Sequence, residues 1–93
     1  MIKSFKCKET EKIYKRIYSK KLPPNIQKVA LRKLWMIDAA LNINDLRIPP
    51  ANHLEILKNK RQRQYSIRIN NQWRICFKWK NNDAYEIEII DYH

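Results

Sequence analysis

Three side chains that can bind or transfer protons stand together at the end of the chain: Asp91, Tyr92 and His93. Two arginines, Arg68 and Arg74, precede them in a strongly strand-like stretch. Cleavage of RNA without a metal needs a base for the ribose 2′-hydroxyl proton, an acid for the leaving 5′-oxygen, and cations for the charged phosphorane. These residue types supply all three, so the sequence predicts an acid–base site for phosphate chemistry on RNA.

Further groups of the same kinds lie in the segment before the strand-like stretch. Each proton-transfer group typically contributes about 10²–10⁴-fold in rate, and lysine or arginine neutralises phosphate charge. The proton-transfer candidates are His53, Glu55, Lys58, Asp91, Tyr92 and His93. The candidates for binding RNA or its phosphates are Arg68, Arg74, Lys58, Lys60, Arg61 and Arg63.

Hydrophobic periodicity and turn residues predict the elements that position these groups. The 93 residues form one domain without repeats or low-complexity segments. Prolines at positions 23 and 24 separate two amphipathic helices, and short polar turns separate the last strands. In chain order we expect a strand at 1–5, helices at 8–19 and 25–41, a connector at 42–50, a strand or helical turn at 53–57, a basic loop at 58–63, and strands at 65–69, 73–79 and 84–91.

Apolar residues are expected on one face of each element. The first helix presents Ile13, Tyr14, Ile17 and Tyr18, and the second presents Ile26, Val29, Ala30, Leu34, Ile37, Ala40 and Leu41. The sheet face that covers the helices is formed by Tyr65, Ile67, Ile69, Trp73, Ile75, Phe77, Trp79, Tyr85, Ile87 and Ile89. Leu31 and Trp35 project from the other side of the second helix. Packing against the first helix is the favoured interpretation for them, and a docking surface for a partner is the alternative.

The first hairpin turn brings two arginines together. If three residues form the turn, Arg68 lies opposite Arg74 on the face of the sheet that is turned away from the core. Like charges in this position destabilise a sheet, so we expect an anion between them or carboxylates nearby. Since Glu86 and Glu88 alternate onto the same face, a surface salt-bridge ladder explains the pattern as well as a phosphate site does.

The composition limits the classes of function. Twenty Lys and Arg residues against nine Asp and Glu residues give a net charge of +11, which favours nucleic acid or a strongly acidic protein as partner. No apolar run approaches the roughly 20 residues of a membrane span, and the basic residues are not gathered on one amphipathic helix. The N-terminus has no secretory signal, so we expect a soluble cytoplasmic protein.

Neither a metal site nor another cofactor is expected. The two cysteines, Cys7 and Cys76, lack the spacing and partners of a zinc site, and Cys76 is expected to be a small packing residue in a strand. The chain has no glycine, so Asn59, Asn71 and Asn82 are expected to supply any left-handed backbone positions.

Two motifs resemble a known family. The segment 66–79, which contains Ile-Arg-Ile-Asn-Asn-Gln-Trp-Arg, and the final Asp-Tyr-His are similar to the HigB branch of the RelE-type toxins, also described as plasmid-maintenance killer proteins. The resemblance runs from residues 1–5 through 34–40 to the last residue. It implies a small α+β fold with two N-terminal helices on a mostly antiparallel twisted sheet.

The resemblance also implies an activity and partners. Family members of this kind are ribosome-dependent endoribonucleases that cut mRNA in the A site of the small subunit. A HigA-like helix-turn-helix antitoxin neutralises them and connects them to operator DNA. The family roles correspond here to Arg74 as the phosphate-contacting arginine, to Asp91 and His93 as the catalytic group with Tyr92 beside them, and to Lys58 as the lysine of a Leu-Lys-Gly element, in which Asn59 replaces glycine.

One departure from the family pattern concerns the second proton-transfer group. Some members have a catalytic histidine at the position of Glu55, whereas this chain has His53 two residues earlier. Alternation along a strand would point both residues the same way, so either one can serve as the base. A different class of function also fits the basic composition: a non-catalytic module that binds RNA, the ribosome or the antitoxin.

Overall fold

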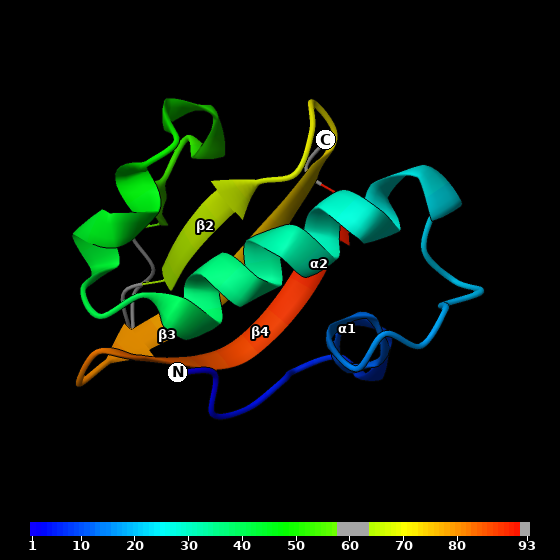
Figure 1. Cartoon of the computed structure of the whole chain (residues 1–93), viewed down its shortest axis with the longest axis horizontal. Helices are drawn as coiled ribbons and strands as arrows, with labels where there is room; N and C mark the ends of the chain where they lie inside the picture. The colour runs from blue at the N-terminus through cyan, green and yellow to red at the C-terminus, as the bar shows by residue number, and fades with distance from the viewer. Residues whose placement is uncertain (58–63, 92–93) are drawn as a thin grey trace.

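Two helices lie on one face of an antiparallel sheet in the computed structural model, which describes residues 1–57 and 64–91 (Figure 1). The helices are α1 (Lys8–Tyr14) and α2 (Pro24–Ala39), followed by the short 3₁₀ helices η1 (Ile43–Arg47) and η2 (Pro50–Asn52). Within these residues the strands follow one another in the order β1 (Glu55–Leu57), β2 (Gln64–Arg68), β3 (Trp73–Lys80) and β4 (Asp83–Asp91). The α+β architecture expected from the sequence is confirmed.

The apolar stripe of α2 packs on the sheet. Pro24 occupies the first turn, where its missing N–H costs no hydrogen bond. Ile26, Ala30 and Leu34 are almost completely buried against core residues of the sheet, as the periodicity predicts. The prediction was wrong for Leu41, which is 80% exposed because the helix ends at Ala39.

The first helix is shorter than its apolar pattern predicts. It ends at Tyr14, and Arg16 adopts a left-handed conformation with φ of 64°, which turns the chain away from the helix axis. Ile17 and Tyr18 are consequently exposed and do not continue a buried helical face. The expected helix at 8–19 was therefore wrong over its second half.

A polar network around Ser19 fixes the loop between the two helices. Ser19 is fully buried, and its hydroxyl donates to Glu9 Oε1 at 2.6 Å. Its backbone N–H donates to Gln27 Oε1, and the Gln27 amide donates to the carbonyls of Ser19 and Leu22. The hydrogen bond from Ser19 lowers the pKa of Glu9 most strongly, burial raises it, and Lys12 lowers it again. The net result is a pKa below the ordinary 4.5.

This network predicts a pH dependence of stability. Because the folded-state pKa of Glu9 is lowered, its carboxylate stabilises the fold above about pH 4.5, and this contribution is lost as the pH falls through the lowered value. We expect the Glu9→Gln variant to have a lower free energy of unfolding than wild type at pH 7, and this difference to shrink below pH 4. Urea unfolding at both pH values measures it. In the control Glu11→Gln, which removes only an exposed pair with Lys15, the loss at pH 7 should be clearly smaller. Equal losses at pH 7 would contradict the prediction.

A bulge in β4 changes which side chains face the core. Glu86 has φ of 50°, and the register between β3 and β4 shifts between Cys76 and Lys78. Beyond the shift Ala84 is opposite Trp79 and is fully buried, whereas Tyr85 is opposite Lys78 on the other face. The expectation that Tyr85 lies on the core face was wrong, because the bulge reverses the alternation that places Ile87 and Ile89 in the core.

The N-terminal segment lies beside β4 as an irregular extension of the sheet. Isolated parallel bridges join Ile2 to Ala84 and Phe5 to Ile87, so the expected strand at 1–5 is reduced to two contacts. Asn82 adopts the left-handed conformation that was expected, but Asn71 does not, and Asn59 lies outside the described residues.

The buried Cys76 is a packing residue in β3, as expected. Burial raises the pKa of its thiol to about 11. Among the helices that the structure describes, none has both the length and the apolar character of a membrane span.

Candidate active site

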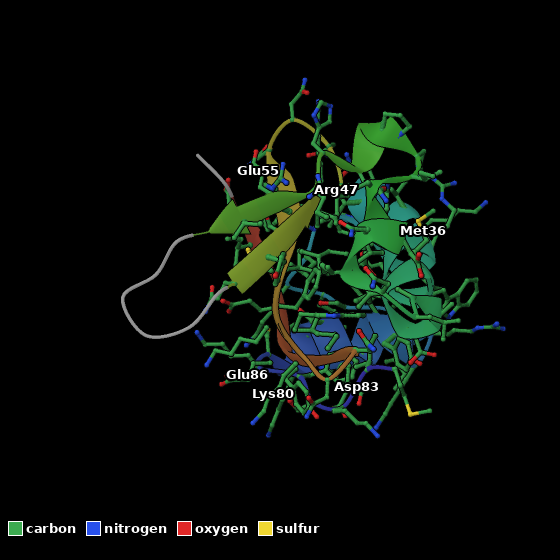
Figure 2. The ribbon with its side chains drawn as sticks, turned by 90° about the vertical axis from the view of Figure 1, so that its left-hand side faces the viewer. Met36, Arg47, Glu55, Lys80, Asp83 and Glu86 are labelled. Atoms are coloured by element: carbon green, nitrogen blue, oxygen red, sulfur yellow. The ribbon has the colours of Figure 1, made fainter. Side chains whose placement is uncertain are left out.

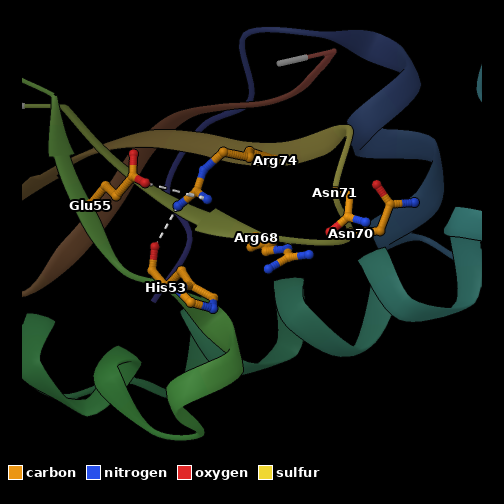
Figure 3. A pocket seen from close by; sticks show the side chains of 6 residues that line it. All are labelled: His53, Glu55, Arg68, Asn70, Asn71 and Arg74. Carbon is orange, nitrogen blue, oxygen red and sulfur yellow. Dashed lines mark hydrogen bonds and ion pairs between the residues drawn. The ribbon is translucent and has the colours of Figure 1, made fainter. Parts of the chain in front are cut away.

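A polar pocket of about 290 Å³ opens where the ends of β2 and β3 meet the segment that follows η2 (Figure 3). The turn between β2 and β3 closes one side of it. Its lining residues are His53, Glu55, Arg68, Asn70, Asn71 and Arg74. The structure thus brings together four of the residues that the sequence predicted for the site.

Arg74 is the most strongly held of these side chains. It is only 6% exposed, and its Nε donates to Ser66 Oγ at 2.9 Å. Nη2 donates to the backbone carbonyls of Ser66 and His53, and Nη1 lies 3.8 Å from Glu55 Oε1. A guanidinium has donors in a fixed planar arrangement, so these contacts set the orientation in which its charge meets the pocket.

The cross-strand arginine pair expected from the turn length is confirmed. Arg68 and Arg74 are direct partners in the register of β2 and β3, and both line the pocket. Glu55 is the carboxylate beside Arg74, and it comes from β1. A pocket with two guanidinium groups and one carboxylate retains a net positive charge and suits a phosphate.

The acidic residues of β4 do not form the salt-bridge ladder that was the alternative. Glu86 pairs with Lys78, and Glu88 pairs with Lys6 at 3.6 Å. Figure 2 shows Glu55 and Glu86 at opposite ends of the sheet. In the part of the chain that the structure describes, neither β4 glutamate forms an ion pair with Arg68 or Arg74.

A buried amide beside the pocket holds the segment that contains His53. Asn52 is fully buried, and its side-chain amide donates to the carbonyls of Leu46 at 3.1 Å and Ile48 at 3.4 Å. Its Oδ1 accepts a hydrogen bond from Lys33 of α2, a lysine that is only 5% exposed. Burial, and secondarily the charge of Arg32, lowers the pKa of Lys33.

These contacts connect the core to the pocket. The residue after Asn52 is His53, which adopts a left-handed conformation with φ of 43°, and its carbonyl accepts the hydrogen bond from Arg74. The position of this carbonyl therefore depends on how η2 is attached to α2. Sequence reasoning did not identify Lys33 or Asn52, because nothing in their local pattern indicates a contact between residues 19 positions apart.

Removal of this amide should cost substantial stability. In Asn52→Ala the buried ammonium of Lys33 loses its partner, and two carbonyls lose a donor. We expect the free energy of unfolding to fall by about 2–4 kcal/mol, as measured by urea denaturation. The control is Asn44→Ala, whose exposed side chain accepts a hydrogen bond from Arg47 Nε, with an expected loss below about 1 kcal/mol. Similar losses in the two variants would show that the buried contact contributes no more to the free energy of unfolding than the exposed one does.

Asp91 lies outside the pocket lining. It is the last residue of β4, it is opposite Trp73, and its Oδ2 accepts a hydrogen bond from the Gln72 side chain at 3.0 Å. Residues 58–63 and 92–93 are outside the described part of the chain, and the expectations for the side chains there remain predictions: Lys58, Lys60, Arg61, Arg63, Tyr92 and His93.

The side chain of Asn70 fixes the turn between Arg68 and Arg74. Asn70 Oδ1 accepts hydrogen bonds from the backbone N–H groups of Gln72 and Trp73. Asparagine commonly stabilises turns in this way, so its presence in the Asn-Asn-Gln turn is the sequence signal for this part of the pocket wall. Across the described residues there is no group of three or more His, Cys, Asp or Glu side chains placed to hold a metal ion.

Comparison with known proteins identifies the family. Residues 3–93 match the model of the family described as the RelE-like toxin of the type II toxin-antitoxin system HigB. The chain belongs to the HigB-like toxin family. It is therefore a toxin of a type II system, for which an antitoxin is the partner, and the resemblance noted in the sequence is confirmed.

Three relatives show how far the similarity of this HigB-like chain extends. Toxin HigB-1 of Vibrio cholerae is 40% identical over 85 residues, which is 90% of each chain. Endoribonuclease HigB of Proteus vulgaris is 33% identical over 93 residues, which is 100% of each chain. An uncharacterized protein of Haemophilus influenzae is 57% identical over 64 residues, which cover 69% of this chain and 63% of that protein.

Proposed function

We propose that this toxin is an endoribonuclease that cuts mRNA in the A site of the ribosome. The observation that supports the proposal most strongly is the pocket in which Arg68 and Arg74 meet His53 and Glu55. The similarity to a protein named Endoribonuclease HigB supports the same reaction class. The reaction would be an in-line attack of a ribose 2′-oxygen on the adjacent phosphorus, in which the 5′-oxygen leaves.

Each group in the proposed site has a defined task. Arg68 and Arg74 hold the phosphate and stabilise the negative charge of the phosphorane, with guanidinium groups in the place that a metal ion has in other nucleases. Asp91 and His93 are the leading proton-transfer pair, and Tyr92 orients the nucleotide. His53 or Glu55 is the further proton-transfer group beside the phosphate. Lys58, Lys60, Arg61 and Arg63 bind mRNA or ribosomal RNA.

The proposal also includes the cellular setting. The toxin acts in the cytoplasm, where the small ribosomal subunit presents mRNA in the A site. A HigA-like helix-turn-helix antitoxin neutralises it and connects the complex to operator DNA. The net charge of +11 favours association with ribosomal RNA and messenger RNA.

Mapping of mRNA 5′ ends tests the reaction class. The wild-type chain and His93→Ala are induced briefly in cells, and the same two proteins are added to purified programmed ribosomes and to the free mRNA. Primer extension should show new ends inside translated codons only where the wild-type chain acts on mRNA that is bound to ribosomes. Cuts in free mRNA would contradict ribosome dependence. Growth arrest with intact messages would instead assign the chain to the non-catalytic binding class.

A further inference from the structure

An apolar groove between the two helices has no role in the proposed reaction. It has a volume of about 320 Å³ and lies where the end of α1 and the following loop meet the first half of α2. Its lining residues are Ile13, Arg16, Ile17, Tyr18, Gln27, Lys28 and Leu31. Among the residues that the structure describes, this lining shares no member with the pocket that contains Arg68 and Arg74.

The apolar side chains around this groove are unusually exposed. Ile17 is 51% exposed, Tyr18 is 61% exposed, and Trp35 on the next turn of α2 is 44% exposed. The guanidinium carbon of Arg16 lies 5.0 Å from the centre of a Trp35 ring, so this arginine extends the surface from α1 to α2. Adjacent exposed apolar residues of this kind mark interaction sites more often than isolated ones do.

Basic residues lie in the groove lining and next to it in the sequence. Arg16 and Lys28 line the groove, and Lys20, Lys21 and Arg32 are close to lining residues in the sequence. All five are exposed, and none of them forms an ion pair with another residue in 1–57 or 64–91. Lys12 and Lys15 of α1, by contrast, are already paired with Glu9 and Glu11. A partner that covers the groove gains the most binding free energy if it combines an apolar stripe with acidic flanks.

The lining of the groove is mostly apolar. Ile13, Ile17 and Leu31 are aliphatic, whereas Tyr18, Arg16 and Lys28 in the same lining could stack on a base or bind a phosphate. Aliphatic residues between two helices commonly take one face of an amphipathic helix, so a protein partner is favoured, and nucleic acid is the alternative that the tests below separate. Apolar anchors would fill the groove, and glutamate or aspartate on the flanks would meet the basic side chains in and beside it.

We infer that this groove binds an acidic amphipathic helix of the antitoxin. The inference rests on the antitoxin partnership, and it is independent of the cleavage chemistry in the proposed function. The described lining residues of the groove and of the pocket differ, so antitoxin affinity and RNA cleavage can be altered separately.

The first test compares matched pairs of exposed apolar residues. The groove variant is Ile17→Ser/Tyr18→Ser, and the control is Leu41→Ser/Ile48→Ser, whose side chains are 80% and 76% exposed away from the groove. The cognate antitoxin is purified alone, and calorimetry measures its Kd for each toxin variant. We expect at least about 30-fold weaker binding for the groove variant and less than threefold for the control. Wild-type affinity in the groove variant would overturn the inference.

A second test addresses the acidic character of the partner. Lys28→Glu/Arg32→Glu should lower the association rate with the antitoxin by at least about tenfold at low salt, and added salt should reduce the difference. The control Lys3→Glu/Lys80→Glu makes the same change in net charge at exposed sites elsewhere. Equal rate losses in both variants would show a response to net charge alone and would contradict an acidic helix at the groove.

Two further readouts separate this inference from the proposed function. Ribosome-dependent cleavage by the groove variants should stay within threefold of wild type. If the groove variants lose ribosome binding while antitoxin affinity is unchanged, the surface is a nucleic-acid contact and the inference fails. If the wild-type toxin cleaves no mRNA, the proposed function fails, but the antitoxin Kd values still decide the inference.

Discussion

The Arg68→Ala variant is expected to cleave ribosome-bound mRNA about 10²–10³-fold more slowly than the wild-type chain. Arg68 lines the pocket directly across from Arg74, and in the proposed reaction it stabilises charge that develops on the phosphate. Its side chain is only half-buried, so its removal should leave the fold intact. Single-turnover cleavage on programmed ribosomes measures the rate, and thermal unfolding verifies that the variant is folded.

An Arg74→Lys variant should lose at least as much activity, for a second reason. A lysine retains the charge, but it cannot donate at once to Ser66 Oγ, the Ser66 carbonyl and the His53 carbonyl. Both the proposed phosphate contact and the position of the His53 segment should therefore change. Because Arg74 is buried, part of this effect is structural, and Arg68→Ala is the cleaner measure of phosphate binding.

The matched control is Arg47→Ala. Arg47 is an exposed arginine on η1 whose Nε donates to Asn44, so its removal makes the same change in net charge outside the pocket. We expect its cleavage rate to stay within about threefold of wild type, since exposed substitutions away from a site have small effects. If Arg68→Ala and Arg47→Ala cleave at the same rate, the arginine pair does not hold the phosphate.

The arginine pair illustrates what could be predicted from the sequence alone. The three residues 70–72 between two strand-like segments fix which residues are opposite each other, because hairpin register depends on loop length. The opposition of Arg68 and Arg74 and the shared apolar face of β2 and β3 then follow from alternation. Loop length and strand alternation are therefore enough to predict register and side-chain facing where the strands are regular.

The errors occur where the backbone leaves its regular conformation. Glu86 and Arg16 both adopt positive φ without being glycine, and each one ends a pattern that the side chains would otherwise continue. The bulge at Glu86 turns Tyr85 out of the core, and the turn at Arg16 exposes Ile17 and Tyr18. Such conformations are stabilised by tertiary contacts, so a local pattern cannot indicate them.

The part of the site that the sequence could not indicate depends on distant contacts. The carbonyl of His53 accepts a hydrogen bond from Arg74, and the preceding residue, Asn52, attaches η2 to Lys33 on α2. No spacing or periodicity connects these three segments before the chain folds. The sequence therefore identified the charged groups of the pocket, while the fold supplies the amide that holds them in place.

The His93→Ala variant should lower the cleavage rate by about 10²–10⁴-fold, the contribution of one proton-transfer group. The arginines remain, so binding of mRNA should change little, and the loss should appear in the single-turnover rate at saturating toxin. Imidazole is the side chain whose charge changes near neutral pH, so the pH–rate profile of this variant should also lose one limb. An unchanged rate would remove His93 from the mechanism and leave Asp91 as the leading group.

His53→Asn tests the second proton-transfer group without disturbing the backbone. Asparagine tolerates the left-handed conformation of this residue, and the carbonyl that accepts from Arg74 is retained. The side chain loses only its ability to take up a proton, so a structural role predicts full activity and a proton-transfer role predicts a loss. We expect a loss of at least about tenfold, and removal of a proton-transfer group should again alter the pH–rate profile. If His53→Asn is fully active and Glu55→Gln is not, the carboxylate 3.8 Å from Arg74 takes the place of the histidine.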